Sequence, residues 1–309
     1  MSIAGTAAPV LPLDQSGPDS PGLIAGRYQL RERLGRGAAA VVFRAVDLQG
    51  GPDAAVKIAA ANGRKQHQRI HDEADVLAAL DHPSIVRLLA QGMMPDGGPQ
   101  SGRPFLVEEL ALGATLAETI RVQSPRPGDV ALWARGLFDA LAHLHSRGLV
   151  HRDIKPANLM LSGLRRSPVR IIDLGIAAAV GSAPEPGISS GTVHYMSPEQ
   201  ASGGVARPSW DVYSMGLVLL ELLTGSKAFP GTAIESLVAR TLRSPDVPDH
   251  LGDWAVLLRS LTAMDPTERP TAAGAAAMAA RLIPTPARPV ASPCRTMRVF
   301  PHRRHRQQA

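Results

Sequence analysis

The fold of this chain is decided by the stretch His151-Arg152-Asp153-Ile154-Lys155-Pro156-Ala157-Asn158-Leu159. An apolar run at 169–172 and then Asp173-Leu174-Gly175 follow it. The pattern predicts that Asp153, Asn158 and Asp173 lie on loops between short β-strands. Phosphoryl transfer needs such a set, because an acid orients the attacking hydroxyl, oxygen ligands hold magnesium, and a cation such as Lys155 stabilises the transferring charge. An isolated His-Arg-Asp would indicate only a solvated turn, whereas the complete loop followed by Asp-x-Gly is specific.

These two segments resemble the catalytic loop and the metal-binding loop of bacterial Ser/Thr protein kinases, which are similar to eukaryotic kinases, with Leu174 where the commoner motif has Phe. The resemblance implies that Asp153 accepts or orients the hydroxyl proton and that Lys155 steadies the transferred phosphoryl group. It also implies that Asn158 and Asp173 hold magnesium. A lysine two residues after the aspartate is the Ser/Thr kinase pattern, as opposed to that of tyrosine kinases.

A glycine-rich turn, Gly35-Arg36-Gly37, lies between two segments of β-type pattern at 28–34 and 41–46. Alone it would indicate an ordinary hairpin. Glycine also lets backbone N–H groups approach an anion. Together with the two loop motifs above, the turn resembles the kinase phosphate loop. The third glycine of the family is Ala40 here. The resemblance implies nucleotide binding by Leu34, Gly35, Gly37 and Val42, with Val42 covering adenine.

Lys57 lies inside the apolar run Ala54-Ala55-Val56-Lys57-Ile58-Ala59, which predicts a third strand. A lysine there could simply extend from an edge strand into solvent. The resemblance instead implies the lysine that anchors the α- and β-phosphates. Glu73, on a helix predicted over residues 66–80, has the spacing of its ion-pair partner, whereas Asp72 and Asp75 are expected on the solvated face.

Residues 86–91 and 104–109 are predicted to form a hairpin, and residues 110–113 the hinge between two lobes. Aligning Gly113-Ala114-Thr115-Leu116 with the family implies that Glu109 and Ala111 bind adenine. The same alignment puts Glu108 at the gatekeeper position behind adenine, where it would compete with Glu73 for Lys57 or supplement it. The alternative is a slip of one residue, with Val107 as gatekeeper and Glu108 on the hinge.

Three further segments match the kinase family in order. Residues 191–200 resemble the peptide-positioning loop and the Ala-Pro-Glu motif, here Ser197-Pro198-Glu199. Asp211 is expected to tie back to the catalytic loop, and Arg269 to pair with Glu199. A helix predicted over residues 129–147 ends at Gly148. The resemblance covers residues 28–282.

Length and composition fit this fold class. The 309 residues are 44% hydrophobic and 4% aromatic, with mean hydropathy near zero, typical of a globular protein with an aliphatic core. We predict an α+β, two-lobed protein kinase fold. The expected divisions are a disordered leader (1–25), a kinase domain (26–283) and a basic disordered tail (284–309). The domain would comprise an N-lobe (26–109), a hinge (110–113) and a C-lobe (114–283).

The net charge of +6 belongs to the tail, which holds six arginines and no acid; removing these six from the 33 Lys and Arg leaves 27, equal to the 27 Asp and Glu. The rest therefore gives no reason to expect nucleic-acid binding. The tail could be a solvated extension, or it could be attracted to an acidic membrane surface or partner. No signal peptide and no membrane span are expected, and the single Cys294 fits a reducing, cytoplasmic location.

The function expected from the resemblance is ATP- and Mg-dependent phosphorylation of Ser and Thr hydroxyls in proteins. The alternatives are a pseudokinase-like binding scaffold and a small-molecule phosphotransferase. Residues 189–192 are expected to be autophosphorylated, through transient self-association, because Arg152 precedes the catalytic aspartate and such an arginine commonly receives an activation-loop phosphate. A loop that is ordered without phosphorylation, with solvated serines, is the other interpretation.

Overall fold

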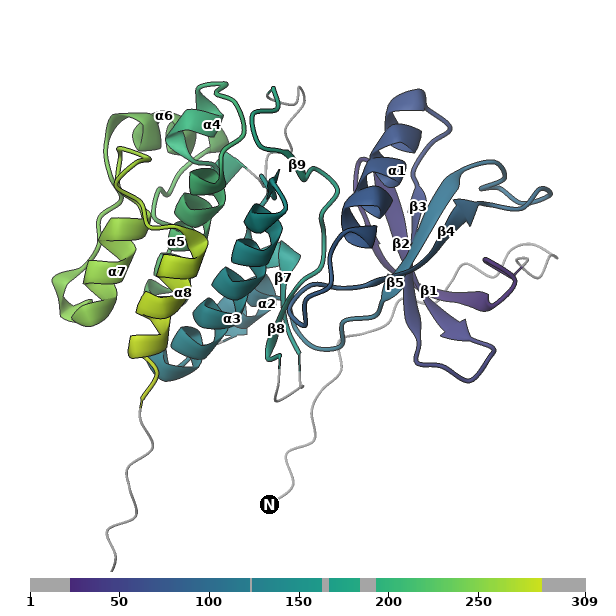
Figure 1. Ribbon diagram of the computed structural model, residues 1–309, viewed down its shortest axis with the longest axis horizontal. Helices are drawn as coiled ribbons and strands as arrows, with labels where there is room; N and C mark the ends of the chain where they lie inside the picture. The colour runs from purple at the N-terminus through teal and green to yellow at the C-terminus, as the bar shows by residue number, and fades with distance from the viewer. Residues whose placement is uncertain (1–22, 123, 163–166, 184–192, 285–309) are drawn as a thin grey trace, which may run out of the picture.

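The computed structural model describes residues 23–122, 124–162, 167–183 and 193–284. A lobe rich in β-structure, drawn in purple and blue, and a larger helical lobe, drawn in teal to yellow, lie side by side (Figure 1). The two-lobed α+β fold expected from the sequence is therefore confirmed. The expected leader and tail fall almost wholly outside the described residues, and the domain limits at 26 and 283 stay predictions.

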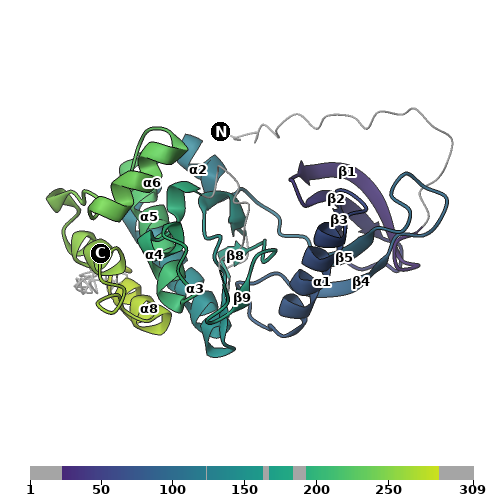
Figure 2. The same cartoon turned by 90° about the horizontal axis from the view of Figure 1, so that it is seen from above.

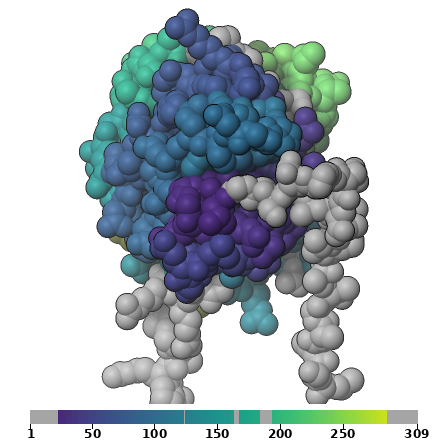
Figure 3. All heavy atoms as spheres, turned by 90° about the vertical axis from the view of Figure 1, so that its right-hand side faces the viewer, coloured from purple at the N-terminus to yellow at the C-terminus, as the bar shows by residue number. Residues whose placement is uncertain are grey.

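The N-lobe is built on one antiparallel sheet in the order β1-β2-β3-β5-β4. Its strands are β1 (Tyr28–Arg36), β2 (Ala40–Asp47), β3 (Ala54–Ala59), β4 (Leu88–Met93) and β5 (Pro104–Glu109). Side chains alternate between the two faces of β5. Phe105 and Val107 join an apolar cluster on one face, whereas Leu106 joins the larger core that includes helix α1. Seen from the N-lobe end, purple and blue residues form the near surface (Figure 3).

Helix α1 (Arg64–Ala78) packs on the face of the sheet to which Leu106 belongs. Its buried residues are Ile70, Glu73, Ala74 and Leu77, which have the spacing of one helical face. Glu73 is thus carried into the interior by its apolar neighbours. Asp72 and Asp75 lie on the exposed face, as predicted.

The C-lobe is formed mainly by helices around α5, which is buried over most of its length and ends at Gly225 with a φ of 72° (Figure 2). The helices are α2 (Leu116–Val122), α3 (Pro127–Ser146), α4 (Pro198–Ala201), α5 (Pro208–Thr224), α6 (Ala233–Leu242), α7 (Asp253–Leu261) and α8 (Ala272–Arg281). Among the described residues, no helix combines the length and apolar character needed to cross a membrane.

Short strands and single helical turns lie between the longer elements of the C-lobe. They are β6 (Leu149–Val150), η1 (Pro156–Asn158), β7 (Leu159–Leu161), β8 (Val169–Ile171), β9 (Ala178–Ala179), η2 (Val193–Tyr195) and η3 (Asp249–Leu251). β6 pairs with β9 and β7 pairs with β8, both antiparallel. The loop at 151–155 therefore starts at β6 and ends at η1, while the loop after β8 begins beside it.

The chain passes from the N-lobe to the C-lobe through residues 110–113. Gly113 has a φ of 139°, and a Cβ atom there would lie 1.9 Å from the carbonyl oxygen of Leu161. Only glycine permits this approach. The hinge is thus held against β7, close to the catalytic loop.

Candidate active site

A lysine and two carboxylates meet between the lobes. Lys57 Nζ lies 2.6 Å from Glu73 Oε1 and 2.9 Å from Asp173 Oδ1. Lys57 comes from β3, Glu73 from the buried face of α1, and Asp173 from the loop after β8. The ion pair expected between Lys57 and Glu73 is present, and Asp173 shares the same ammonium group.

The charges at this site shift the pKa values of its members. Burial alone would lower the pKa of Lys57, but the carboxylates of Asp173 and Glu73 outweigh it and raise that pKa. Burial raises the pKa of Glu73, which Lys57 opposes. Partial burial works against ionisation of Asp173, yet Lys57 and the N–H of Gly175 hold the pKa of its carboxyl well below its usual range. Lys57 and Asp173 are therefore charged at neutral pH.

Glu108 is a third carboxyl group beside this ammonium. Its side chain is almost fully buried on β5, and among the described residues its Oε2 atom has no hydrogen-bond partner. Burial raises the pKa of Glu108 to about 8, with the charges of Glu73 and Asp173 adding to the effect and Lys57 opposing it. With its nearest cation already shared by two carboxylates, Glu108 is mostly protonated at pH 7.

This placement decides between the two sequence alignments. A one-residue slip would have put Glu108 on the hinge, away from Lys57, and that alternative is wrong because Glu108 is buried near Lys57 and Glu73. Of the two expected relations, Glu108 does not displace Glu73 from Lys57, and its charge only supplements that of Glu73. Lys57 forms its ion pairs with Glu73 and Asp173, and Glu108 acts on it only over a longer distance.

The loop between β6 and η1 carries Asp153. Its Oδ2 atom accepts hydrogen bonds from Lys155 Nζ at 2.7 Å and from Asn158 Nδ2 at 3.0 Å. Asn158 Nδ2 also donates to the carbonyl of Asp153 at 3.0 Å. These bonds fix the aspartate side chain, so all three residues predicted from the loop lie together.

Asp211, near the start of α5, binds the backbone of the same loop. Its two carboxylate oxygens accept the backbone N–H groups of His151 at 2.8 Å and Arg152 at 2.9 Å. His145 Nε2 lies 2.8 Å from Asp211 Oδ2. The tie between Asp211 and the catalytic loop was expected, whereas His145 was not singled out because nothing in the sequence marks a histidine on α3 as its neighbour.

The residues expected to hold magnesium fit that ion in chemistry. Ile172 N donates to the carbonyl of Asn158 at 3.1 Å, which brings Asp173 beside Asn158. Asn158 donates through its nitrogen, which leaves its side-chain oxygen as an acceptor. Asp173 uses Oδ1 for Lys57 and Gly175, which leaves Oδ2. Two oxygen donors suit a hard cation that retains water and phosphate ligands.

The residues expected around the nucleotide lie on the β1–β2 turn and the hinge. Gly35 pairs with Val42, and Gly37 N donates to the carbonyl of Ala40 at 2.8 Å, which closes the turn. Leu34 is half exposed, and Ala111 is partly buried in the hinge. No described contact tests their part in binding adenine.

Glu109, the last residue of β5 before the hinge, has a partner that the sequence did not predict. Its Oε2 atom lies 2.8 Å from Nη1 of Arg170 on β8, and its backbone N–H donates to the carbonyl of Arg87 at 2.9 Å. The carboxylate of Glu109 therefore joins the hinge to the C-lobe. A contact between residues so far apart in sequence depends on how the lobes pack, which local patterns do not show.

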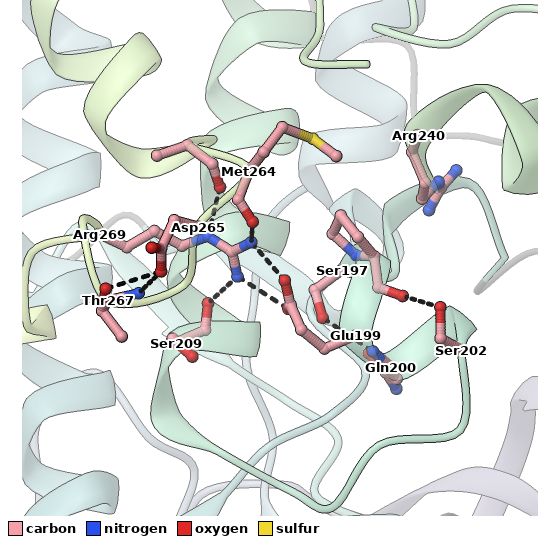
Figure 4. A network of polar contacts seen from close by, with 12 residues as sticks. Ser197, Glu199, Gln200, Ser202, Ser209, Arg240, Met264, Asp265, Thr267 and Arg269 are labelled. Atoms are coloured by element: carbon pink, nitrogen blue, oxygen red, sulfur yellow. Dashed lines mark hydrogen bonds and ion pairs between the residues drawn. The ribbon is translucent and has the colours of Figure 1, made fainter. Parts of the chain in front are cut away.

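The segment after η2 is anchored to both the catalytic loop and the helices. Gln200 Nε2 donates to the carbonyl of Arg152 at 2.8 Å, and Tyr195 OH donates to Glu221 at 2.6 Å. Arg269 forms two bonds with Glu199, at 2.7 and 2.9 Å, as expected (Figure 4). Residues 184–192, which include the whole expected phosphorylation stretch at 189–192, lie outside the described residues.

A five-stranded lobe with a buried lysine–glutamate pair, joined by a hinge to a helical lobe that carries Asp153, Asn158 and Asp173, defines a protein kinase fold. The chain matches the protein kinase domain family over residues 28–279 and belongs to that family.

Named relatives are bacterial Ser/Thr protein kinases. The chain is 34% identical to serine/threonine-protein kinase PrkC of Bacillus subtilis over 261 residues, which are 80% of this chain and 39% of the relative. It is 36% identical to PknB of Mycobacterium leprae and 35% identical to PknB of Mycobacterium tuberculosis, each over 237 residues, 74% of this chain and 37% of the relative. The chain thus matches about two fifths of the length of these relatives.

Proposed function

We propose that this chain transfers the γ-phosphoryl group of ATP to Ser and Thr hydroxyl groups of proteins. The observation that carries the proposal is the presence of two neighbouring charged clusters at the junction of the lobes, Lys57–Glu73–Asp173 and Asp153–Lys155–Asn158. The first cluster would bind the phosphates and the second would receive the hydroxyl group, while Asp173 and Asn158, one from each cluster, would hold the metal. The shared family and the names of the relatives support the same activity.

In the proposed reaction, the hydroxyl oxygen forms a bond to the γ-phosphorus while the bond between the γ-phosphorus and its bridging oxygen breaks, with the electron pair leaving on ADP. The Asp153 carboxylate accepts the hydroxyl proton and orients the attacking oxygen. Lys155, already 2.7 Å from Asp153, steadies the charge on the transferred group. Lys57, oriented by Glu73, holds the α- and β-phosphates.

Asn158 and Asp173 would hold magnesium, which neutralises phosphate charge when it is bound. In the structure Asp173 and the phosphate-binding Lys57 are in contact, so nucleotide binding requires Lys57 to exchange at least part of this contact for phosphate oxygens. Leu34, Gly35, Gly37, Val42, Glu109 and Ala111 complete the proposed nucleotide site. Behind this proposed site, Glu108 is a buried polar residue at the gatekeeper position, where an apolar residue is usual.

We also propose autophosphorylation within residues 189–192, by transient self-association, in a reducing cytoplasmic compartment. Arg152 supports it, because its side chain contacts the carbonyl of Ile176 at 2.5 Å, at the start of the loop that carries these residues. Mass spectrometry of an active preparation that finds no phosphate between residues 175 and 198 would contradict this part alone.

The test is transfer of labelled phosphate from ATP to a general protein substrate, with wild type beside Asp153→Asn. Wild type should label protein on Ser and Thr, and Asp153→Asn should not, while both bind nucleotide. Equal labelling by the two proteins would overturn the assignment of Asp153. Nucleotide binding without labelling by either protein would favour a binding scaffold, and labelling of small molecules alone a small-molecule phosphotransferase.

A further inference from the structure

Basic side chains gather on the surface beside the peptide-positioning segment, and among the described residues none of them forms an ion pair. Helix α6 packs against η2 and α4, which flank Met196 and Ser197. Four basic residues gather where α6 meets this segment, around the ring of Phe229. We call His194, Lys227, Arg240 and Arg243 the α6 basic cluster.

Arg240 is the buried member of the cluster. It is fully buried, and its Nη1 atom donates to the carbonyl of Met196 at 2.7 Å, while Nε and Nη2 bind the carbonyl and hydroxyl of Ser236. All of these acceptors are neutral. Burial lowers the pKa of Arg240 to about 10, so it remains charged at neutral pH. Figure 4 draws Arg240 near Ser197, beside the network that holds Glu199.

Lys227 and Arg243 extend the charge outward. The guanidinium carbons of Arg240 and Arg243 lie 5.6 and 5.5 Å from the centre of the Phe229 ring. Burial lowers the pKa of His194, and the charges of Lys227 and Arg240 lower it further. Lys227 and Arg243 are exposed, and His194 is half-buried. The charges of Lys227 and Arg243 are therefore available to a molecule lying on this surface.

The acids of neighbouring elements make their contacts with other residues and form no ion pair with the cluster. Glu199 is bound to Arg269, Glu221 to Tyr195, and Glu235 to its own helix start through Thr232. Within the part of the chain that the structure describes, no carboxylate lies within ion-pair distance of Lys227, Arg240 or Arg243. Even Asp246, three residues after Arg243, forms no ion pair with it. Among the described residues, the charged members of the cluster therefore have no direct ion-pair partner.

We propose that the α6 basic cluster selects protein segments with acidic residues beside the accepting Ser or Thr. This rests on the proposed kinase function, because the accepting segment must lie along residues 193–200 to bring its hydroxyl to Asp153. Gln200 fixes that route by binding the carbonyl of Arg152, the residue before Asp153. Aspartate and glutamate of such a segment are attracted by Lys227 and Arg243, and lysine and arginine are repelled.

Peptides with one acceptor Ser and a single Glu or Lys at each flanking position provide the test. For wild type, the ratio of kcat/KM for Glu over Lys should exceed one on one side of the acceptor. Exposed charge pairs contribute about two- to five-fold each. The ratio should fall toward one in high salt, because a field of this kind is screened. A ratio of one at every position in low salt would overturn the proposal.

Two charge reversals assign the effect to the cluster. Lys227→Glu and Arg243→Glu change exposed side chains, so folding should be kept, and their double variant should invert the preference toward Lys peptides. Arg281→Glu, an equal charge change at the exposed end of α8, is the matched control and should leave the wild-type ratio unchanged. If the double variant keeps the wild-type ratio, the cluster does not select substrates. If wild type phosphorylates neither peptide nor protein, the proposed function itself fails.

Discussion

Asp211 Oδ1 accepts the backbone N–H of Arg152 at 2.9 Å, and Arg152 holds a φ of 67°. This conformation is uncommon for a residue with a Cβ atom and costs on the order of 1–3 kcal/mol unless the surroundings impose it. The neighbouring N–H of His151 binds the other oxygen of Asp211, and Gln200 binds the carbonyl of Arg152. The strained residue directly before Asp153 is therefore fixed from both sides.

Asp211→Asn is expected to disturb catalysis as well as stability. An amide offers one acceptor atom where the carboxylate offers two, so one buried N–H of the loop would face another donor. The unpaired group should cost about 1–3 kcal/mol in the free energy of unfolding. A displaced Asp153 should lower kcat by about 10²-fold. Asp139→Asn, an exposed acid on α3, is the control for chemical denaturation and turnover. Unchanged turnover in Asp211→Asn would show that Asp211 does not position Asp153.

Asp153→Asn should separate chemistry from binding. Loss of a positioned acid–base group typically lowers kcat by ~10²–10⁴-fold, whereas the phosphates are bound by other residues. We expect unchanged ATP affinity by calorimetry and greatly reduced transfer. Asp72→Asn, on the exposed face of α1, is the control and should be normal in both measurements. A large loss of ATP affinity in Asp153→Asn would show that Asp153 also determines nucleotide binding.

Local patterns predicted the strands best. β3 and β5 begin and end where the sequence placed them, because turn residues flank β3 and a hinge follows the alternating residues of β5. Helix α1 begins at Arg64, two residues before the predicted start. The sequence carries no signal for this start, because Gly63 provides no side-chain cap and the first helical residues are polar. Its apolar periodicity marked the buried face correctly but not the ends.

Local patterns likewise located some residues of the candidate site but not others. Asp153, Asn158 and Asp173 lie on contiguous motifs, so the sequence located them and the fold brings them together. The pairing of Glu109 with Arg170 and the contact of Arg240 with Met196 depend on how distant elements pack. A single sequence holds no signal for either contact.

Glu108 and Lys57 should be energetically coupled even though they form no direct ion pair. Lys57 lowers the pKa of Glu108, and Glu108 raises that of Lys57. Lys57→Met should weaken ATP binding and strongly reduce phosphoryl transfer. In a double-mutant cycle with Glu108→Met, measured by ATP affinity, we expect a coupling energy of about 1 kcal/mol, since groups in one charged network are rarely additive. A coupling energy of zero would mean that Glu108 does not act on the phosphate-binding lysine.

The buried pair of Arg269 and Glu199 should contribute far more to stability than an exposed pair. The Arg269 side chain is fully buried and lies 4.7 Å from the ring centre of Tyr213. Arg269→Met should cost about 3–5 kcal/mol, because it leaves a partly buried carboxylate unpaired. Adding Glu199→Gln should recover part of that loss.

Arg259, which pairs with exposed Asp249, is the matched control. Arg259→Met should change the free energy of unfolding by about 1 kcal/mol or less. Similar losses for Arg259→Met and Arg269→Met in urea unfolding would contradict the difference expected from burial.

Glu108 should make the protein less stable as the pH rises toward 8. In the unfolded chain a glutamate ionises near pH ~4.3. In the folded protein burial and two neighbouring carboxylates raise the pKa of Glu108 to about 8. Between these values the folded state holds one more proton than the unfolded state, so stability falls with rising pH, by up to about 1.4 kcal/mol per pH unit, and levels off above pH 8.

Glu108→Gln keeps the shape and removes the titration, so it isolates this contribution from all others. The difference in the free energy of unfolding between Glu108→Gln and wild type should increase from pH 5 to pH 8 in favour of the variant. Glu118→Gln, on exposed helix α2, is the control and should show no such trend. A difference that is independent of pH over this range would mean that Glu108 is already ionised at pH 5 in the folded protein. An ionised Glu108 would require Lys57 to neutralise its charge. Burial and the two neighbouring carboxylates favour the protonated form.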